Sequence, residues 1–215
     1  MSYEEISDIY GSEETYRSAC EKVAAIPNIK EQCARAGAEY DEDSNRITVA
    51  YLNRPYVLTL SDCQISPRDK YADANEEITA MDKTLIVHYL TLAKGTALSG
   101  RLVTYKQVPG GIPYFARFSH LAVDPLISHF GEKPELLIPA AEKMGGAKVN
   151  RGDAAITINA FSRVPITIVL QGGDEEFPPT ASVMFDSTIP DYLPSEDIRI
   201  LCEIITAKLI KSDRR

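Results

Sequence analysis

The chain has 215 residues, and its 31 acidic side chains outnumber its 23 lysines and arginines, which gives a net charge of −8. This balance argues against a nucleic-acid-binding protein, which needs a basic stripe to neutralise phosphates, and against an anionic membrane surface as a partner. No run of 18 apolar residues occurs and the first ten residues lack the apolar core of a signal peptide, so we expect a cytoplasmic protein.

The first half of the chain predicts helices around one β-hairpin. Ser12 before Glu13 and Glu14 is typical of a helix start, because the hydroxyl caps the first turn and the acids favour its positive end. Alternating β-branched and aromatic residues indicate two strands joined by a turn at 53–55. The predicted elements are helices over 13–26, 28–37 and 75–94 and strands over 46–52 and 56–60.

The second half predicts a three-stranded antiparallel meander with further helices. Its strands alternate apolar and polar residues, which indicates one buried face. The predicted elements are a short strand within 101–108, a helix over 114–130 broken at Pro125, a helix from Pro134 to Gly145, strands over 154–160, 166–170 and 181–185, and a final helix from Ser195. The fold class is therefore α+β, an antiparallel hairpin and a three-stranded meander packed with about five helices. We expect a single domain over 1–215, with subdomains 1–108 and 109–215 as the alternative.

The four cysteines are Cys20, Cys33, Cys63 and Cys202, and no two of them form a C-x-x-C pair. This spacing argues against a zinc ribbon and against an iron–sulfur cluster. Cys20 and Cys202 fall on the apolar faces of predicted helices, so we interpret them as buried free thiols. We expect no disulfide, because a reducing cytoplasm disfavours one.

The negative charge is concentrated at one end of the sequence. Seven of the eight net charges belong to residues 1–45, and the other 170 residues are nearly neutral. A solvated helix face with an acidic turn explains this pattern. The alternative is a docking surface for a basic protein partner.

An acidic loop between two strands is the densest polar cluster of the chain. It contains Asp174, Glu175, Glu176 and Phe177, and Asp186 ends the strand that follows it. Neighbouring carboxylates can bind a hard cation or supply a general base, which gives a metal-dependent enzyme as one hypothesis. A hairpin turn with a solvated tip is the alternative. The spacing does not match a known metal-binding loop, so we assign no metal site.

His88 lies at the edge of the apolar stripe of its predicted helix, about 80° from the centre of that stripe. An imidazole in this position can ligate a metal, including the metal of a tetrapyrrole at the mouth of a pocket. The alternative is a histidine that packs at the border of the core. We take His88 and its neighbour Tyr89 as candidate ligand-binding residues, together with the acidic loop and Asp186.

Several short segments together resemble the family called domain of unknown function 3786. They are Ala38-Glu39-Tyr40-Asp41, His88-Tyr89-Leu90, Arg163-Val164-Pro165, the run from Gly173 to Pro178, and Met184-Phe185-Asp186. The resemblance implies the cytoplasm of an anaerobe and a place near corrinoid or one-carbon metabolism. Some members of the family carry an added iron–sulfur domain similar to that of corrinoid iron–sulfur proteins, and this chain has no cysteine-rich segment of that kind. The resemblance implies no catalytic residue.

Three functions follow from these observations, in order of preference. The first is a non-catalytic binding protein, with a corrinoid, haem or other tetrapyrrole as the ligand. The second is a protein-interaction module that docks a basic partner through residues 1–45. The third is a metal-dependent enzyme that uses the loop from Asp174 to Glu176.

Overall fold

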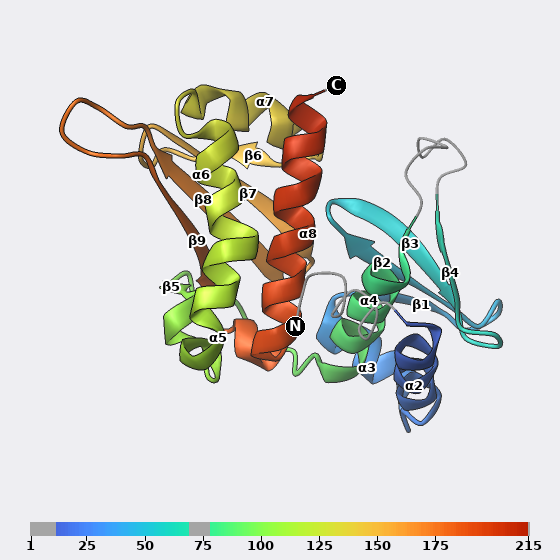
Figure 1. Ribbon diagram of the computed structural model, residues 1–215. Helices are drawn as coiled ribbons and strands as arrows, with labels where there is room; N and C mark the ends of the chain where they lie inside the picture. The colour runs from blue at the N-terminus through green and yellow to red at the C-terminus, as the bar shows by residue number, and fades with distance from the viewer. Residues whose placement is uncertain (1–11, 69–77, 215) are drawn as a thin grey trace. The chain divides into compact units, whose positions relative to one another are not determined.

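The computed structural model describes residues 12–68 and 78–214, and the chain divides into two compact units, Met1–Thr96 and Ala97–Arg215 (Figure 1). We call them the first and the second unit. The division falls earlier than the subdomain boundary after residue 108 that the sequence suggested. The reason is that strand β5 (Leu102–Thr104) pairs with a strand of the second unit.

The first unit contains a four-stranded antiparallel sheet in the order β1-β2-β3-β4. Its strands are β1 (Glu39–Asp41), β2 (Arg46–Tyr51), β3 (Arg54–Thr59) and β4 (Gln64–Pro67). The predicted hairpin is confirmed as β2 and β3, but its turn is Leu52-Asn53 rather than 53–55. Both turn residues have positive φ, 49° and 60°, as expected of the tight turns that match the twist of a hairpin. Pro55 therefore lies in the strand, opposite Ala50.

Three helices accompany this sheet, namely α2 (Glu13–Ala24), α3 (Ile29–Ala36) and α4 (Ala80–Leu92). Ser12 caps α2, as predicted, by accepting a hydrogen bond from the backbone N–H of Thr15 at 3.2 Å. α4 begins with a reciprocal pair of hydrogen bonds between Thr79 and Asp82. The first residues of the helix predicted over 75–94 lie outside the described residues. α2 packs along α4.

The expectation that Cys20 is a free thiol is wrong, because Cys20 forms a disulfide with Cys63. Cys20 lies one turn after Tyr16 at the border of the buried face of α2. The turn between β3 and β4 brings Cys63 to this border, and the Tyr16 hydroxyl donates a hydrogen bond to the Cys63 carbonyl. The helical pattern of the sequence indicated that Cys20 lies beside the core. It could not indicate which residue from another segment contacts Cys20. Cys202 is a buried free cysteine, as predicted.

The second unit contains a five-stranded antiparallel sheet in the order β5-β9-β8-β7-β6. Besides β5, its strands are β6 (Ala147–Lys148), β7 (Ala154–Phe161), β8 (Val164–Gln171) and β9 (Thr180–Asp186). The predicted meander is confirmed as β7, β8 and β9. β5 extends it at one side and confirms the short strand predicted within 101–108. β6 extends it at the other side and was not predicted, because two residues are too few to show a period of two.

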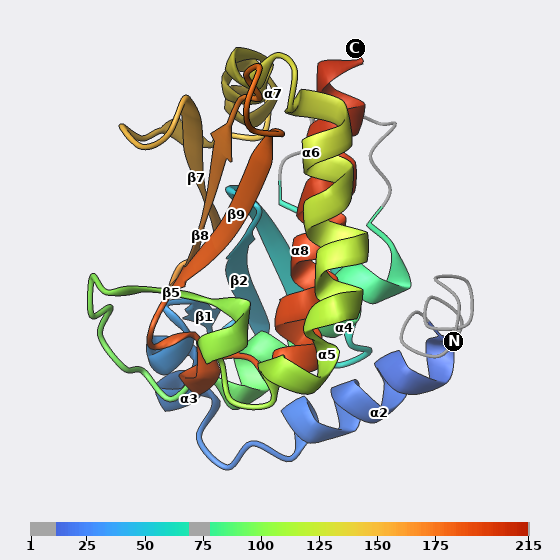
Figure 2. The same cartoon turned by 60° about the vertical axis from the view of Figure 1, so that its left-hand side comes forward.

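Helices cover one face of this sheet, with α6 and α8 side by side (Figures 1 and 2). They are α5 (Gly111–Phe118), α6 (Asp124–Phe130), α7 (Leu137–Glu142) and α8 (Ser195–Asp213). The break expected at Pro125, in the predicted helix over 114–130, does not occur. A π-helical turn, Ser119–Val123, joins α5 to α6, and Pro125 occupies the first turn of α6, where its missing N–H is tolerated. The α+β class is thus confirmed. Among the described residues, no helix has the length and apolarity to cross a membrane.

Candidate functional site

His88 lines a groove of about 580 Å³ in the first unit. The other lining residues come from α2 and its cap, and most are polar: Ser12, Glu14, Thr15, Ser18, Ala19 and Lys22. His88 is the α4 residue in this lining, and its side chain is half-buried, as its position at the edge of the apolar stripe predicted. His88 is therefore the one residue of this groove that the sequence singled out, and the packing of α2 along α4 brings the others beside it.

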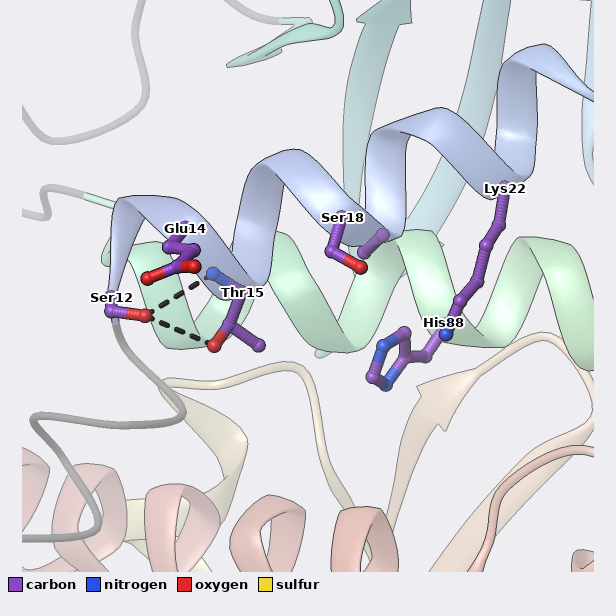
Figure 3. A pocket seen from close by; sticks show the side chains of 7 residues that line it. Ser12, Glu14, Thr15, Ser18, Lys22 and His88 are labelled. Carbon is purple, nitrogen blue, oxygen red and sulfur yellow. Dashed lines mark hydrogen bonds between the residues drawn. The ribbon is translucent and has the colours of Figure 1, made fainter.

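The wall that α2 contributes is a row of hydroxyls with the Glu14 carboxylate near one end and the Lys22 ammonium group at the other. Thr15, Ser18 and Lys22 are spaced three and four residues apart, so they share one face of the helix. The Ser12 hydroxyl lies 3.0 Å from that of Thr15, and Lys22 runs from α2 toward α4, where His88 lies (Figure 3). This combination of hydroxyls, an ammonium group and an imidazole can bind a group with several hydrogen-bond acceptors.

Tyr89, the second predicted residue on α4, does not face the groove. Its side chain is fully buried, and its hydroxyl donates a 2.5 Å hydrogen bond to the carbonyl of Ala36 at the end of α3. Consecutive residues of a helix point about 100° apart, so His88 and Tyr89 face different surroundings. Tyr89 ties α4 to α3 and is not available to a ligand in the groove.

The acidic loop in the second unit is an exposed turn. Asp174, Glu175, Glu176 and Phe177 are all exposed, and 67% of the Phe177 surface is accessible. The Asp174 carboxylate accepts hydrogen bonds from the backbone N–H groups of Glu176 and Phe177, at 2.9 and 2.7 Å, which closes the turn. Among residues 12–68 and 78–214, no group of three or more His, Cys, Asp or Glu is arranged to hold a metal ion.

Asp186 does not approach this loop, because it ends β9 whereas the loop precedes the start of the same strand. It is buried, and its carboxylate accepts hydrogen bonds from Ser99, Gly100 and Thr188. Burial raises the pKa of Asp186, but the hydrogen bonds from Thr188 and Ser99 together outweigh burial and lower the pKa to about 2. Asp186 therefore fastens the start of β5 to the end of β9.

A second groove, of about 400 Å³, was not predicted from the sequence. It lies in the second unit between β9 and the α5–α6 helix, and its apolar lining includes Phe115, Phe118 and Ile127. Phe118 stacks on Tyr105 with 4.2 Å between ring centroids. One feature of the sequence points to the strand beside this groove. Residues 180–183, directly after Pro178-Pro179, are a strand segment without charge or proline.

The family described as domain of unknown function (DUF3786) matches residues 28–208. No curated protein and no solved structure matches the chain. The matched range includes His88 and the whole lining of the second groove, and it begins after α2, which supplies the polar wall of the first.

Proposed function

The chain belongs to the DUF3786 family, and we propose that it is a non-catalytic binding protein whose ligand contacts His88 in the groove between α2 and α4. The observation that supports this proposal is that an imidazole, an ammonium group and three hydroxyls line one groove of about 580 Å³, together with the Glu14 carboxylate. The size lies within the range of small-molecule sites. As the ligand we propose a corrinoid, with haem or another tetrapyrrole as the alternative, in an anaerobe.

The groove residues fit one part of such a ligand better than another. His88 would ligate the metal of a tetrapyrrole, and the hydroxyls with Lys22 would hydrogen-bond its amide or carboxylate side groups. The Glu14 carboxylate in the same lining would accept hydrogen bonds from amides and would disfavour carboxylates. Ala19 is the one apolar residue in the lining, so the groove offers little apolar surface to the ring face. We therefore propose that the groove would hold polar side groups of the ligand and that His88 would be the residue that ligates its metal.

Absorbance titration of the full chain with cobalamin, and separately with haem, tests this function. Binding through His88 shifts the absorbance bands of the metal complex, and His88→Ala abolishes that shift. Thr91→Ala is a matched control, because Thr91 lies on the same helix and does not line the groove. The absence of a spectral change with both compounds, or an unchanged response in His88→Ala, would remove the proposal.

We propose the cytoplasm as the location, and the Cys20–Cys63 disulfide makes this testable. A reducing cytoplasm keeps thiols reduced, so the pair would exist there as two thiols. Cells lysed into acid and treated with a thiol-specific label should then show both cysteines labelled. Labelling of neither cysteine would place the protein in an oxidising compartment.

A second candidate function is docking of a basic protein partner through the acidic end of the chain. In support, the acids of residues 12–45 are all exposed, on α2, on α3 and around β1. Because salt screens exposed charges beyond about 10 Å at 0.1 M, binding of a polylysine probe should weaken steeply as salt rises. Binding that does not depend on salt contradicts this candidate. With a net charge of −8, we propose neither nucleic acid nor an anionic membrane as a partner.

A further inference from the structure

Strand β9 is an outer strand along half of its length. β5 pairs with Met184, Phe185 and Asp186 and then turns away into a 3₁₀ helix, Tyr105–Gln107. Residues 180–183 pair with β8 on one side, and in the described part of the chain no strand pairs with them on the other. Figure 2 shows β9 along the rim of the sheet with β5 at one end of it.

The hydrogen-bonding direction of this half can be assigned from its neighbour. Ser187 donates its backbone N–H to the carbonyl of Arg101, next to β5, at 2.8 Å. In an antiparallel strand every second residue directs its N–H and C=O to the same side. Ala181 and Val183 are an even number of residues from Ser187, so their main-chain groups point to the open side of β9.

The other strand edges carry features that disfavour pairing with another chain. β1 has Glu39 and Asp41, β4 ends in Pro67, and β6 is two residues long and carries Lys148. β7 has a bulge near Asn159, beyond the end of β6. Charges, prolines, bulges and short strands are the usual protections of a sheet edge. The segment 180–183, Thr-Ala-Ser-Val, has none of them.

The open half of β9 borders the groove of about 400 Å³, which all four of its residues line. On the opposite wall, Phe115 and Ile127 offer apolar surface, and the Lys106 ammonium lies 4.0 Å from the centre of the Phe115 ring. We propose that this groove binds an extended peptide segment of a partner protein, which adds to the sheet as an antiparallel strand opposite residues 180–183. An apolar side chain of the peptide enters between β9 and the α5–α6 helix.

The surroundings favour a single extended segment over a second copy of the chain. β5 and the turn at Tyr105 stand at one end of the open edge, and α6 runs beside it. A folded sheet that approached edge to edge would meet these elements, whereas one extended segment meets only the groove. Unpaired main-chain groups supply affinity for such a segment, and the apolar wall supplies its side-chain preference.

The test uses peptides selected on the full chain from a random decapeptide display library. Ala181→Pro removes an N–H that points to the open side, so the ladder with β8 keeps its hydrogen bonds. Ala181→Ser is the matched control, because it keeps this N–H. We expect Ala181→Pro to raise the Kd of the peptide about tenfold or more, which corresponds to about 1.4 kcal/mol of binding free energy. Ala181→Ser should change the Kd less than about twofold. Circular dichroism and thermal unfolding report whether each variant is folded.

A second arm modifies the peptide and leaves the protein unchanged. Two peptides are compared, one N-methylated at its odd-numbered residues and the other at its even-numbered residues. One of them should lose binding and the other should keep it, because only alternate N–H groups form hydrogen bonds to the neighbouring strand. Equal binding of the two methylated peptides overturns the proposal, and so does a selection that yields no binding peptide. A dimer of the unmodified chain that Ala181→Pro converts to a monomer also overturns it, and then a second copy is the occupant.

Discussion

The two units stabilise a helix by different kinds of chemistry. In the first unit the Cys20–Cys63 disulfide lies near the surface and joins α2 to the β3–β4 turn. In the second unit α8 carries a buried ion pair within the helix itself, Arg199 with Glu203 one turn later, whose side chains are 2% and 7% exposed. The disulfide depends on redox conditions, whereas the ion pair depends on the mutual neutralisation of two buried charges.

The buried ion pair is stable only under one condition. Burial raises the pKa of Glu203, and Arg199 and Arg117 oppose this rise. Two charges taken out of water repay their desolvation only while they remain together. The second unit is therefore sensitive to the loss of one partner and tolerant of the loss of both.

The largest expected effect is that of Arg199→Ala, which leaves Glu203 buried without its partner. We expect the free energy of unfolding to fall by about 3–5 kcal/mol, measured by urea denaturation at neutral pH. The double variant Arg199→Met with Glu203→Leu replaces the pair by apolar side chains of similar size and should recover most of this loss. A single variant that costs less than about 1 kcal/mol would show that Glu203 does not need Arg199 in the core.

The disulfide of the first unit should have a smaller and conditional effect. It closes a loop with a sequence separation of 43 residues. Such a loop corresponds to about 4 kcal/mol in the chain-entropy treatment, and measured disulfides often deliver less. We expect the double variant Cys20→Ala with Cys63→Ala to lose about 2–4 kcal/mol of stability under oxidising conditions.

Reductant provides the control for this variant. The unmodified chain with reductant should unfold at the same urea concentration as the variant, and reductant should leave the variant itself unchanged. If reductant does not shift the unmodified chain, the two units do not differ in redox dependence and the comparison between them fails.

Asp186→Asn should have the smallest effect, and it depends on pH. The pKa of Asp186 is lowered to about 2 from the usual 3.8, so the folded state favours the ionised carboxylate. This contribution to stability is fully present above about pH 4 and is lost as the pH falls toward 2. We expect Asp186→Asn to cost about 1–2 kcal/mol at pH 7 and almost nothing at pH 2.

Asp174→Asn is the matched control, because Asp174 also accepts backbone hydrogen bonds but lies in an exposed turn. It should change the stability by less than about 0.5 kcal/mol at either pH. Equal losses for the two variants would mean that burial of Asp186 adds nothing to its role at the end of β9.

The sequence predicted what a local pattern encodes. The cap at Ser12, the helix over 28–37, the central hairpin and the meander are confirmed, because each depends on residues close together in the chain. His88 at the edge of its stripe is likewise a matter of helical period. The position of the hairpin turn was predicted wrongly from Pro55. The pairing of β2 with β3 places the turn at Leu52-Asn53.

The features that were not predicted depend on contacts between segments distant in the sequence. Hydrophobic periodicity does not describe such contacts. The disulfide joins α2 to a turn of the sheet, and Asp186 is separated from the acidic loop by the length of a strand. The wall that α2 contributes to the His88 groove follows from helix packing and not from any motif. The same is true of the groove beside β9, which exists because β5 turns away after Thr104.

The π-helical turn Ser119–Val123 sets the rotational phase between the two helices that it joins. Phe118 and Phe130 lie twelve positions apart, and on a regular α-helix they would point about 120° apart. A π turn holds about one residue more than an α turn, which returns the later side chain to nearly the same face. Both phenylalanines are accordingly buried. Deleting a single residue from 119–123 would therefore leave a regular α-helix with eleven positions between the two phenylalanines, about 20° apart, and Phe130 would stay on the buried face. A regular α-helix over all twelve positions would instead turn Phe130 by about 100° away from that face.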